Sequence, residues 1–156
     1  PSTPYGAMPI LNEDGRALAH SNAILTYVGR THGLHPSDPW AAAQHEAIMV
    51  SVEDLRSKLP GRPGMPDDEK KTAREEFAAG WLTQWAKTVD ASIAGPFVGG
   101  NELNVVDLKV AVIVRGFLSG IYDHLPGSFF DAYPKILGLV AAVNAHPAVA
   151  AYFASR

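Results

Sequence analysis

Only one short region of this chain, residues 8–19, has the pattern of β-structure, and this region limits the fold more than any other feature. Residues 8–11 form a short apolar run, and residues 12–15 are turn formers that precede residues 16–19. This pattern predicts a β-hairpin. Two strands are marginally stable in water and cannot form a sheet that buries a helix. We therefore expect the start of the chain to be the second half of an α/β domain whose first half precedes Pro1.

The rest of the chain has helical signals. Residues 21–32 have helical spacing, and a Gly and a Pro within residues 33–36 act as stop signals. Asp38 followed by Pro39 is typical of a helix start, which predicts a helix to about residue 59. Further helices are predicted over residues 67–93, from residue 104 onward, over 133–145 and over 147–155. We expect an α+β fold, in which a hairpin and a helix are followed by an all-helical bundle.

Two side-chain patterns within these helices are interpreted as structural. Phe77, Trp81 and Trp85 recur every four residues, which predicts core or domain packing and not a cofactor-binding box. Asn104 and Asp107 have the spacing of a capping box, in which the acid bonds the amide of the cap residue. The helix that they open is apolar nearly all round, so we expect it at the centre of the bundle.

Composition excludes several classes of function. The formal net charge of −3 provides no basic surface for nucleic acid or an anionic membrane. The chain has no cysteine, which excludes disulfides, thiolate nucleophiles and cysteine-based metal sites. No apolar run approaches the roughly 20 residues of a membrane span, because Asp107 and Lys109 interrupt the longest candidate. His32 and His35 have helix-like spacing, but the intervening Gly33 argues against a metal site.

Pro9 and Ser21 are the two candidates for ligand binding that the residues themselves indicate. Proline has no N–H, so Pro9 is expected at the start or edge of a strand. A cis bond before it would turn the backbone of Met8 outward to pair with a peptide-like ligand; the alternative is an ordinary edge-strand proline. Ser21 begins a helix, where unpaired N–H groups and a positive dipole end can hold a carboxylate. Its alternative role is that of an N-cap bonded to its own helix.

Five segments together resemble one protein family. They are "GAMPIL", "HSNAILTYVGRTHGL", "SVEDLR", "FVGGNELNVVDL" and "YPKILGLVAAVNAHPAVAAYF", and they extend over nearly the whole chain. Their order and spacing resemble the cytosolic glutathione S-transferases, most of all the classes that use an N-terminal tyrosine (sigma, pi, mu and alpha). The resemblance implies that residues 1–36 are the C-terminal half of a thioredoxin-like, glutathione-binding domain. It also implies that residues 37–156 are an all-helical domain.

The resemblance further implies a binding site for glutathione. Pro9 matches the family's cis-proline, which presents Met8 to the peptide, and Ser21 matches the serine that holds the γ-glutamyl carboxylate. His20 stands where the family has glutamine, and a neutral imidazole can still donate one hydrogen bond. Asp54 matches an acid that reaches across the dimer interface to the ammonium of the glutathione bound there. No residue here matches the catalytic group, and the activating tyrosine is expected in a preceding segment.

These features predict a glutathione transferase. It would use glutathione as its co-substrate, without a metal, and add the thiolate to a small electrophile, as a homodimer in the cytoplasm. The chain as given is expected to bind glutathione poorly and to catalyse little, because it carries half of the site. The alternative is a non-catalytic relative that serves as a structural or assembly module. Pro9, Ser21 and Asp54 occur together, which favours the enzyme, since a scaffold has no need of that set.

Overall fold

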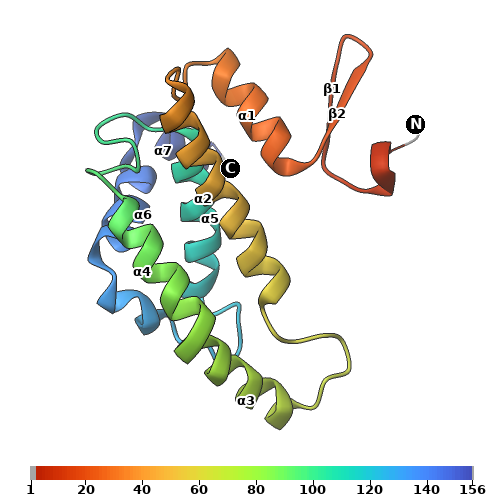
Figure 1. Cartoon of the computed structure of the whole chain (residues 1–156), viewed down its shortest axis with the longest axis vertical. Coiled ribbons are helices and arrows are strands. Elements are labelled where there is room, and N and C mark those ends of the chain that lie inside the picture. Colours follow the sequence, from red (N-terminus) through yellow and green to blue (C-terminus); the bar gives the residue numbers. More distant parts are fainter. Residues whose placement is uncertain (1–2, 156) are drawn as a thin grey trace.

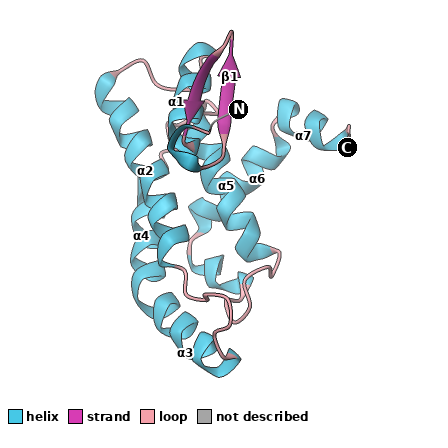
Figure 2. Ribbon diagram, turned by 90° about the vertical axis from the view of Figure 1, so that its right-hand side faces the viewer, coloured by secondary structure: helices cyan, strands magenta, loops and turns pink. Residues whose placement is uncertain are grey.

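The computed structural model describes residues 3–155, and Figure 1 shows two regions. A hairpin of β1 (Ile10–Glu13) and β2 (Arg16–Ala19) leads into α1 (Ser21–Thr31) at one end of the molecule. The longer region is a bundle of helices, which Figure 2 shows from the side. Its elements are α2 (Pro39–Lys58), α3 (Asp67–Phe77), η2 (Ala78–Leu82), α4 (Thr83–Ser92), α5 (Val105–Leu118), η3 (Gly127–Ala132), α6 (Pro134–Ala145) and α7 (Pro147–Ala154). The predicted α+β class is confirmed, and a short turn of 3₁₀ helix, η1 (Pro4–Gly6), precedes the hairpin.

The hairpin has a tighter turn than the sequence pattern indicated. The strands are antiparallel, and Glu13 lies opposite Arg16. The turn therefore consists of Asp14 and Gly15 alone, and both have positive φ angles, 50° and 79°, as a two-residue type I′ turn requires. The prediction that Asn12 and Glu13 belong to the turn is wrong. A type I′ turn matches the twist of the strands, so pairing can continue up to it.

A single glycine allows α1 to lie close against the bundle. Of the residues of α1, all of which the structure describes, only Gly29 is buried. A Cβ atom at this position would lie 3.1 Å from the Cβ of His35 and 3.1 Å from the methyl carbons of Val105. The Val105 N–H also donates to the Leu34 carbonyl at 2.9 Å. A larger residue at position 29 would push α1 away from this junction.

The long helix α2 begins where the sequence predicted. Asp38 is its N-cap, and the Asp38 Oδ1 accepts a hydrogen bond from the Ala41 N–H at 2.8 Å. Pro39 occupies the first helical position, where a missing N–H costs nothing. The buried residues recur every three or four positions, so one face of α2 packs on the bundle. They are Ala42, His45, Met49, Val52 and Leu55.

The elements α3, η2 and α4 follow one another without a break, and η2 is a π-helical turn. The four-residue spacing of Phe77, Trp81 and Trp85 fits this turn, because a wider turn keeps such residues nearer one face than 3.6 residues per turn would. Phe77 and Trp85 are buried, as the predicted packing role requires. The rings of Phe77 and Trp81 stack with their centroids 5.8 Å apart. The π-helical turn itself was not predicted from the sequence.

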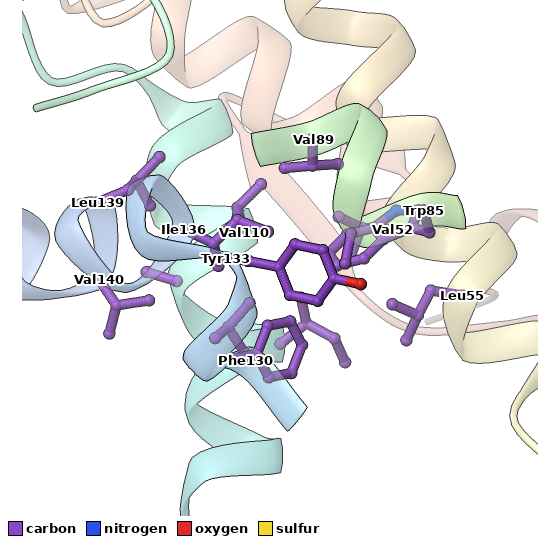
Figure 3. Close-up of a cluster of buried hydrophobic side chains, with 14 of the residues drawn as sticks. Val52, Leu55, Trp85, Val89, Val110, Phe130, Tyr133, Ile136, Leu139 and Val140 are labelled. Atoms are coloured by element: carbon purple, nitrogen blue, oxygen red, sulfur yellow. The ribbon is translucent and has the colours of Figure 1, made fainter. Parts of the chain in front are cut away.

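The helix α5 lies at the centre of the bundle, as predicted. Val106, Val110 and Val114 are fully buried, and α5 contacts both α2 and α6. Figure 3 shows Val110 in one cluster with Val52 of α2 and Ile136 of α6. The apolar positions of α5 therefore hold together helices that are distant in the sequence.

The start of α5 is fixed by the predicted capping box of Asn104 and Asp107. The Asp107 Oδ2 accepts from the Asn104 N–H at 2.7 Å, and its Oδ1 accepts from the Val98 N–H at 2.8 Å. Burial raises the pKa of Asp107 to about 6, although these backbone hydrogen bonds act in the opposite direction. One buried carboxylate thus joins the preceding loop to the first turn of α5.

In residues 3–155, no single helix combines the length and the apolar character needed to cross a membrane. Taken together, α6 and α7 have the length and composition of a membrane span, but the two helices are bent by 63° at the break between them.

Candidate functional site

The two residues predicted to present a peptide ligand lie just before β1. The Met8–Pro9 bond is cis, as predicted. Met8 is 74% exposed, and pairing with β2 begins only at Ile10. Within the described part of the chain, the N–H and carbonyl of Met8 have no hydrogen-bond partner. Both groups are therefore open to a ligand.

His20 and Ser21 join the hairpin to α1. His20 is the N-cap, with φ 72° and ψ 127°, and its ring centroid lies 5.0 Å from that of Tyr5. Ser21 is therefore the first helical residue, and the alternative that Ser21 is the N-cap is wrong. The first bond inside the helix runs from the Ile24 N–H to the His20 carbonyl at 3.0 Å. The N–H groups before Ile24 thus point out of the helix end without an intrahelical partner.

The Ser21 hydroxyl belongs to a polar cluster that connects α1, α2 and α5. We name it the Lys109 cluster, and its members are Ser21, Asn22, Glu53 and Lys109. The Ser21 Oγ–H donates to Glu53 Oε1 at 3.1 Å, and Ser21 Oγ accepts from Lys109 Nζ at 3.4 Å. Lys109 Nζ also donates to Asn22 Oδ1 and to Glu53 Oε1. The Lys109 side chain is 8% exposed and that of Glu53 is 41% exposed.

The cluster contains one acidic and one basic side chain, Glu53 and Lys109, whose opposite charges balance each other. Burial raises the pKa of Glu53, but the hydrogen bond and the charge of Lys109, together with the Ser21 hydroxyl, outweigh burial and hold that pKa below its usual value. Glu53 is therefore ionised at neutral pH. Neither Glu53 nor Lys109 was predicted from the sequence. The available signal was a lysine within an apolar helix, because a buried lysine almost always has a partner.

Asp54 lies next to Glu53 on α2 but points elsewhere, because successive helical residues differ by about 100° in direction. Asp54 is exposed. Among residues 3–155, its carboxylate makes no hydrogen bond or ion pair. Within one chain, Ser21 thus contacts Glu53, whereas Asp54 faces solvent.

Two hollows lie beside α2. The larger one, which we name the α2–α4 groove, has a volume of about 650 Å³ and includes Ile48, Trp81 and Trp85 in its walls. None of the residues predicted to bind glutathione lines this groove. The smaller hollow, of about 460 Å³, lies between α1 and α2 and includes Asn22 of the Lys109 cluster.

Two buried histidines lie near the junction of α1 with the bundle. His35 is 7% exposed and His45 is 4% exposed, and their ring centroids lie 6.3 Å apart. Burial lowers the pKa of His45, and the charge of His35 adds to this effect. In the described part of the chain, no group of three or more His, Cys, Asp or Glu residues could hold a metal ion.

Comparison with known proteins relates this geometry to one family. A family model described as "Glutathione S-transferase, C-terminal domain" matches residues 53–156. The chain is 28% identical to "Glutathione S-transferase P" of Bos taurus, over 97% of this chain and 70% of that protein. It is 26% identical to "Glutathione S-transferase S1" of Drosophila melanogaster, over 100% of this chain and 62% of that protein. It is 29% identical to "Hematopoietic prostaglandin D synthase" of Gallus gallus, over 100% of this chain and 76% of that protein.

Solved structures share the fold. Prostaglandin synthase D of Nilaparvata lugens superposes with a TM-score of 0.82 at 24% identity, over 99% of this chain and 76% of that one. A glutathione transferase homologue from sulfitobacter, solved with bound glutathione, superposes with a TM-score of 0.73 at 24% identity, over 99% of this chain and 76% of that one. These likenesses show the arrangement of a thioredoxin-like portion followed by a helical bundle. The family match covers most of the chain, and the chain therefore belongs to the glutathione S-transferase family.

Proposed function

We propose that this protein is a glutathione transferase, which adds the thiolate of glutathione to small electrophiles. The family match over residues 53–156 carries the proposal. Two of the similar proteins are named glutathione S-transferases, and one similar structure was solved with glutathione bound. Glutathione is accordingly the proposed co-substrate, and no metal takes part in the proposed reaction.

The two ends of glutathione would be held by different groups. The open N–H and carbonyl of Met8, next to Pro9, can pair with the peptide backbone as an added strand would. The free N–H groups in the first turn of α1 and the Ser21 hydroxyl can hold the γ-glutamyl carboxylate. The imidazole of His20 lies beside that turn and can donate one further bond. Met8, Pro9, His20 and Ser21 are the proposed binding residues of one chain.

The chemical step depends on the thiolate form of glutathione. A free thiol has a pKa of about 8.5, so the enzyme must stabilise the thiolate near neutral pH. Tyr5 packs against His20, and we assign it a structural role. We assign no catalytic residue among residues 3–155.

We further propose that the protein acts as a homodimer in which Asp54 of one protomer receives the ligand ammonium bound by the other. The exposed Asp54, which has no partner among the described residues, supports this. The α2–α4 groove supports it as well, because a second copy could cover its apolar walls. The proposed domains are residues 1–36 and 37–156. The proposed location is the cytoplasm, where glutathione is abundant and thiols stay reduced.

The test is calorimetric binding of glutathione by the full-length protein and by its Ser21→Ala variant. The variant should bind more weakly by about 1–2 kcal/mol, because it loses one hydrogen bond to the carboxylate. The control ligand is the α-linked isomer, whose free carboxylate is placed differently, and both proteins should bind it weakly. Conjugation of 1-chloro-2,4-dinitrobenzene is followed in parallel. A full-length wild type that binds no glutathione would overturn the proposal and favour a non-catalytic structural or assembly module.

A further inference from the structure

We propose that Lys109 is a positioning residue for the γ-glutamyl carboxylate of glutathione, and that it acts through Glu53 and Ser21. The inference rests on the proposed function, in which the first turn of α1 receives that carboxylate. Lys109 belongs to α5 of the bundle, whereas Ser21 belongs to α1. The lysine influences the ligand without touching it, by compensating a charge beside the serine.

Glu53 creates an electrostatic problem at the proposed site. Its Oε1 lies 3.1 Å from Ser21 Oγ, and it is ionised at neutral pH. A ligand carboxylate bonded to the same hydroxyl would lie close to this charge, and like charges at such separations repel strongly outside bulk water. Two carboxylates can therefore share Ser21 only if one of them is compensated by a cation.

Lys109 supplies that cation. Its ammonium donates to Glu53 Oε1, Asn22 Oδ1 and Ser21 Oγ, which accounts for all three of its N–H donors. Because the side chain is 8% exposed, its charge is screened by salt much less than that of a surface lysine. Arg56, further along α2, also lowers the pKa of Glu53, but Lys109 has the larger effect.

The same contacts determine where the Ser21 proton can go. A serine hydroxyl has one proton, and in this structure it is donated to Glu53. The hydroxyl must turn away from Glu53 before it can donate to a ligand carboxylate. Glu53 can give up this bond because Lys109 still donates to the same oxygen. The bond from Lys109 to Ser21 Oγ, at 3.4 Å, holds the oxygen in place while the proton turns.

The experiment uses the full-length protein and compares the wild type with Lys109→Met and with the double variant Glu53→Gln/Lys109→Met. Calorimetry measures binding of glutathione and of 4-aminobutyryl-cysteinyl-glycine, which lacks the γ-glutamyl carboxylate. Lys109→Met should weaken glutathione binding about tenfold, because Glu53 is left uncompensated, but should change binding of the analogue less than about twofold. The double variant, which has neither charge, should return to within about threefold of the wild type. Thermal unfolding checks that each variant is folded, and Lys109→Gln replaces Lys109→Met if the latter does not fold.

A second measurement requires no ligand. The pKa of Glu53, followed by NMR of its carboxyl carbon, should be higher in Lys109→Met than in the wild type. An unchanged Glu53 pKa, no loss of affinity, or an equal loss for both ligands would overturn this inference and leave the proposed function standing. A wild type that binds no glutathione would overturn the proposed function and this inference with it.

Discussion

His45 is a titratable side chain enclosed by the bundle. It is 4% exposed, and within residues 3–155 its Nδ1 has no hydrogen-bond partner. Burial lowers the pKa of this ring, and the charge of His35 lowers it further. The acid in this region faces the other ring, because Glu46 Oε1 lies 3.5 Å from His35 Nε2. The positive charge that His45 gains on protonation is therefore not balanced by an acidic group among the described residues.

Acidification should accordingly destabilise the protein through His45. A histidine whose pKa is lowered by folding contributes its full stability above the ordinary pKa of 6.5, and that contribution is lost as the pH falls below this value. Between about pH 8 and about pH 5.5, His45→Phe should lose less unfolding free energy than the wild type. Urea unfolding at both pH values measures this, with the variant's own stability at the higher pH as the control. Equal losses in the two proteins would contradict the prediction.

Among the elements, the start of α5 depends on one buried side chain, Asp107, which accepts hydrogen bonds from two backbone N–H groups. Asp107→Asn should reduce the unfolding free energy by about 2–3 kcal/mol, because an amide has one acceptor oxygen and leaves one of two buried N–H donors unpaired. Asp38→Asn is the matched control. Asp38 accepts one exposed hydrogen bond at the start of α2, and asparagine is an equally good N-cap. Denaturant unfolding measures the unfolding free energy of both variants. Similar losses for the two substitutions would disprove the special role of Asp107.

The starts of α2 and α5 could be predicted from the sequence because their chemistry is local. Asp38 bonds a residue three positions along the chain, and Asp107 bonds Asn104 three positions back. The contact of Glu53 with Lys109 could not be predicted in this way. The two residues are 56 positions apart in the sequence, and only the packing of α2 against α5 brings them together. The π-helical turn was missed for another reason: a spacing of four residues is also compatible with an ordinary α-helix.

The candidate site was predictable only in part for the same physical reason. The cis bond before Pro9 and the position of Ser21 at the start of α1 were predicted from the sequence and its resemblance to a family. What the Ser21 hydroxyl bonds depends on side chains from two other helices, which no local pattern reveals. The placement of Asp54 opposite a second chain stays a prediction.

For the whole molecule, the central prediction is that Ser21 and Asp54 of one site come from different protomers. Ser21→Ala and Asp54→Asn proteins should each bind glutathione weakly alone. After the two are mixed and their subunits exchange, half of the dimers are mixed, and each mixed dimer has one intact site. By two-fold symmetry about a quarter of all sites should then regain wild-type affinity. Calorimetry measures the fraction of tight sites.

The control for this mixture is the double variant Ser21→Ala/Asp54→Asn mixed with Ser21→Ala, which can form no intact site. Absence of recovery in the first mixture, although native mass spectrometry with one variant isotope-labelled shows mixed dimers, would place both residues in one protomer. A monomer at working concentration would remove the proposed role of Asp54 altogether.

The single buried residue of α1, Gly29, has a consequence for how the molecule opens. Regions with few buried contacts unfold locally at a lower free energy than the core does. The backbone amides of α1 should therefore exchange their hydrogens with solvent faster than those of α5, whose apolar residues are largely enclosed. The hairpin and α1 would form one cooperative unit and the bundle another, joined by the Lys109 cluster and the bond between Leu34 and Val105. Substitutions that loosen this joint would weaken ligand binding while the bundle still melts at its usual temperature.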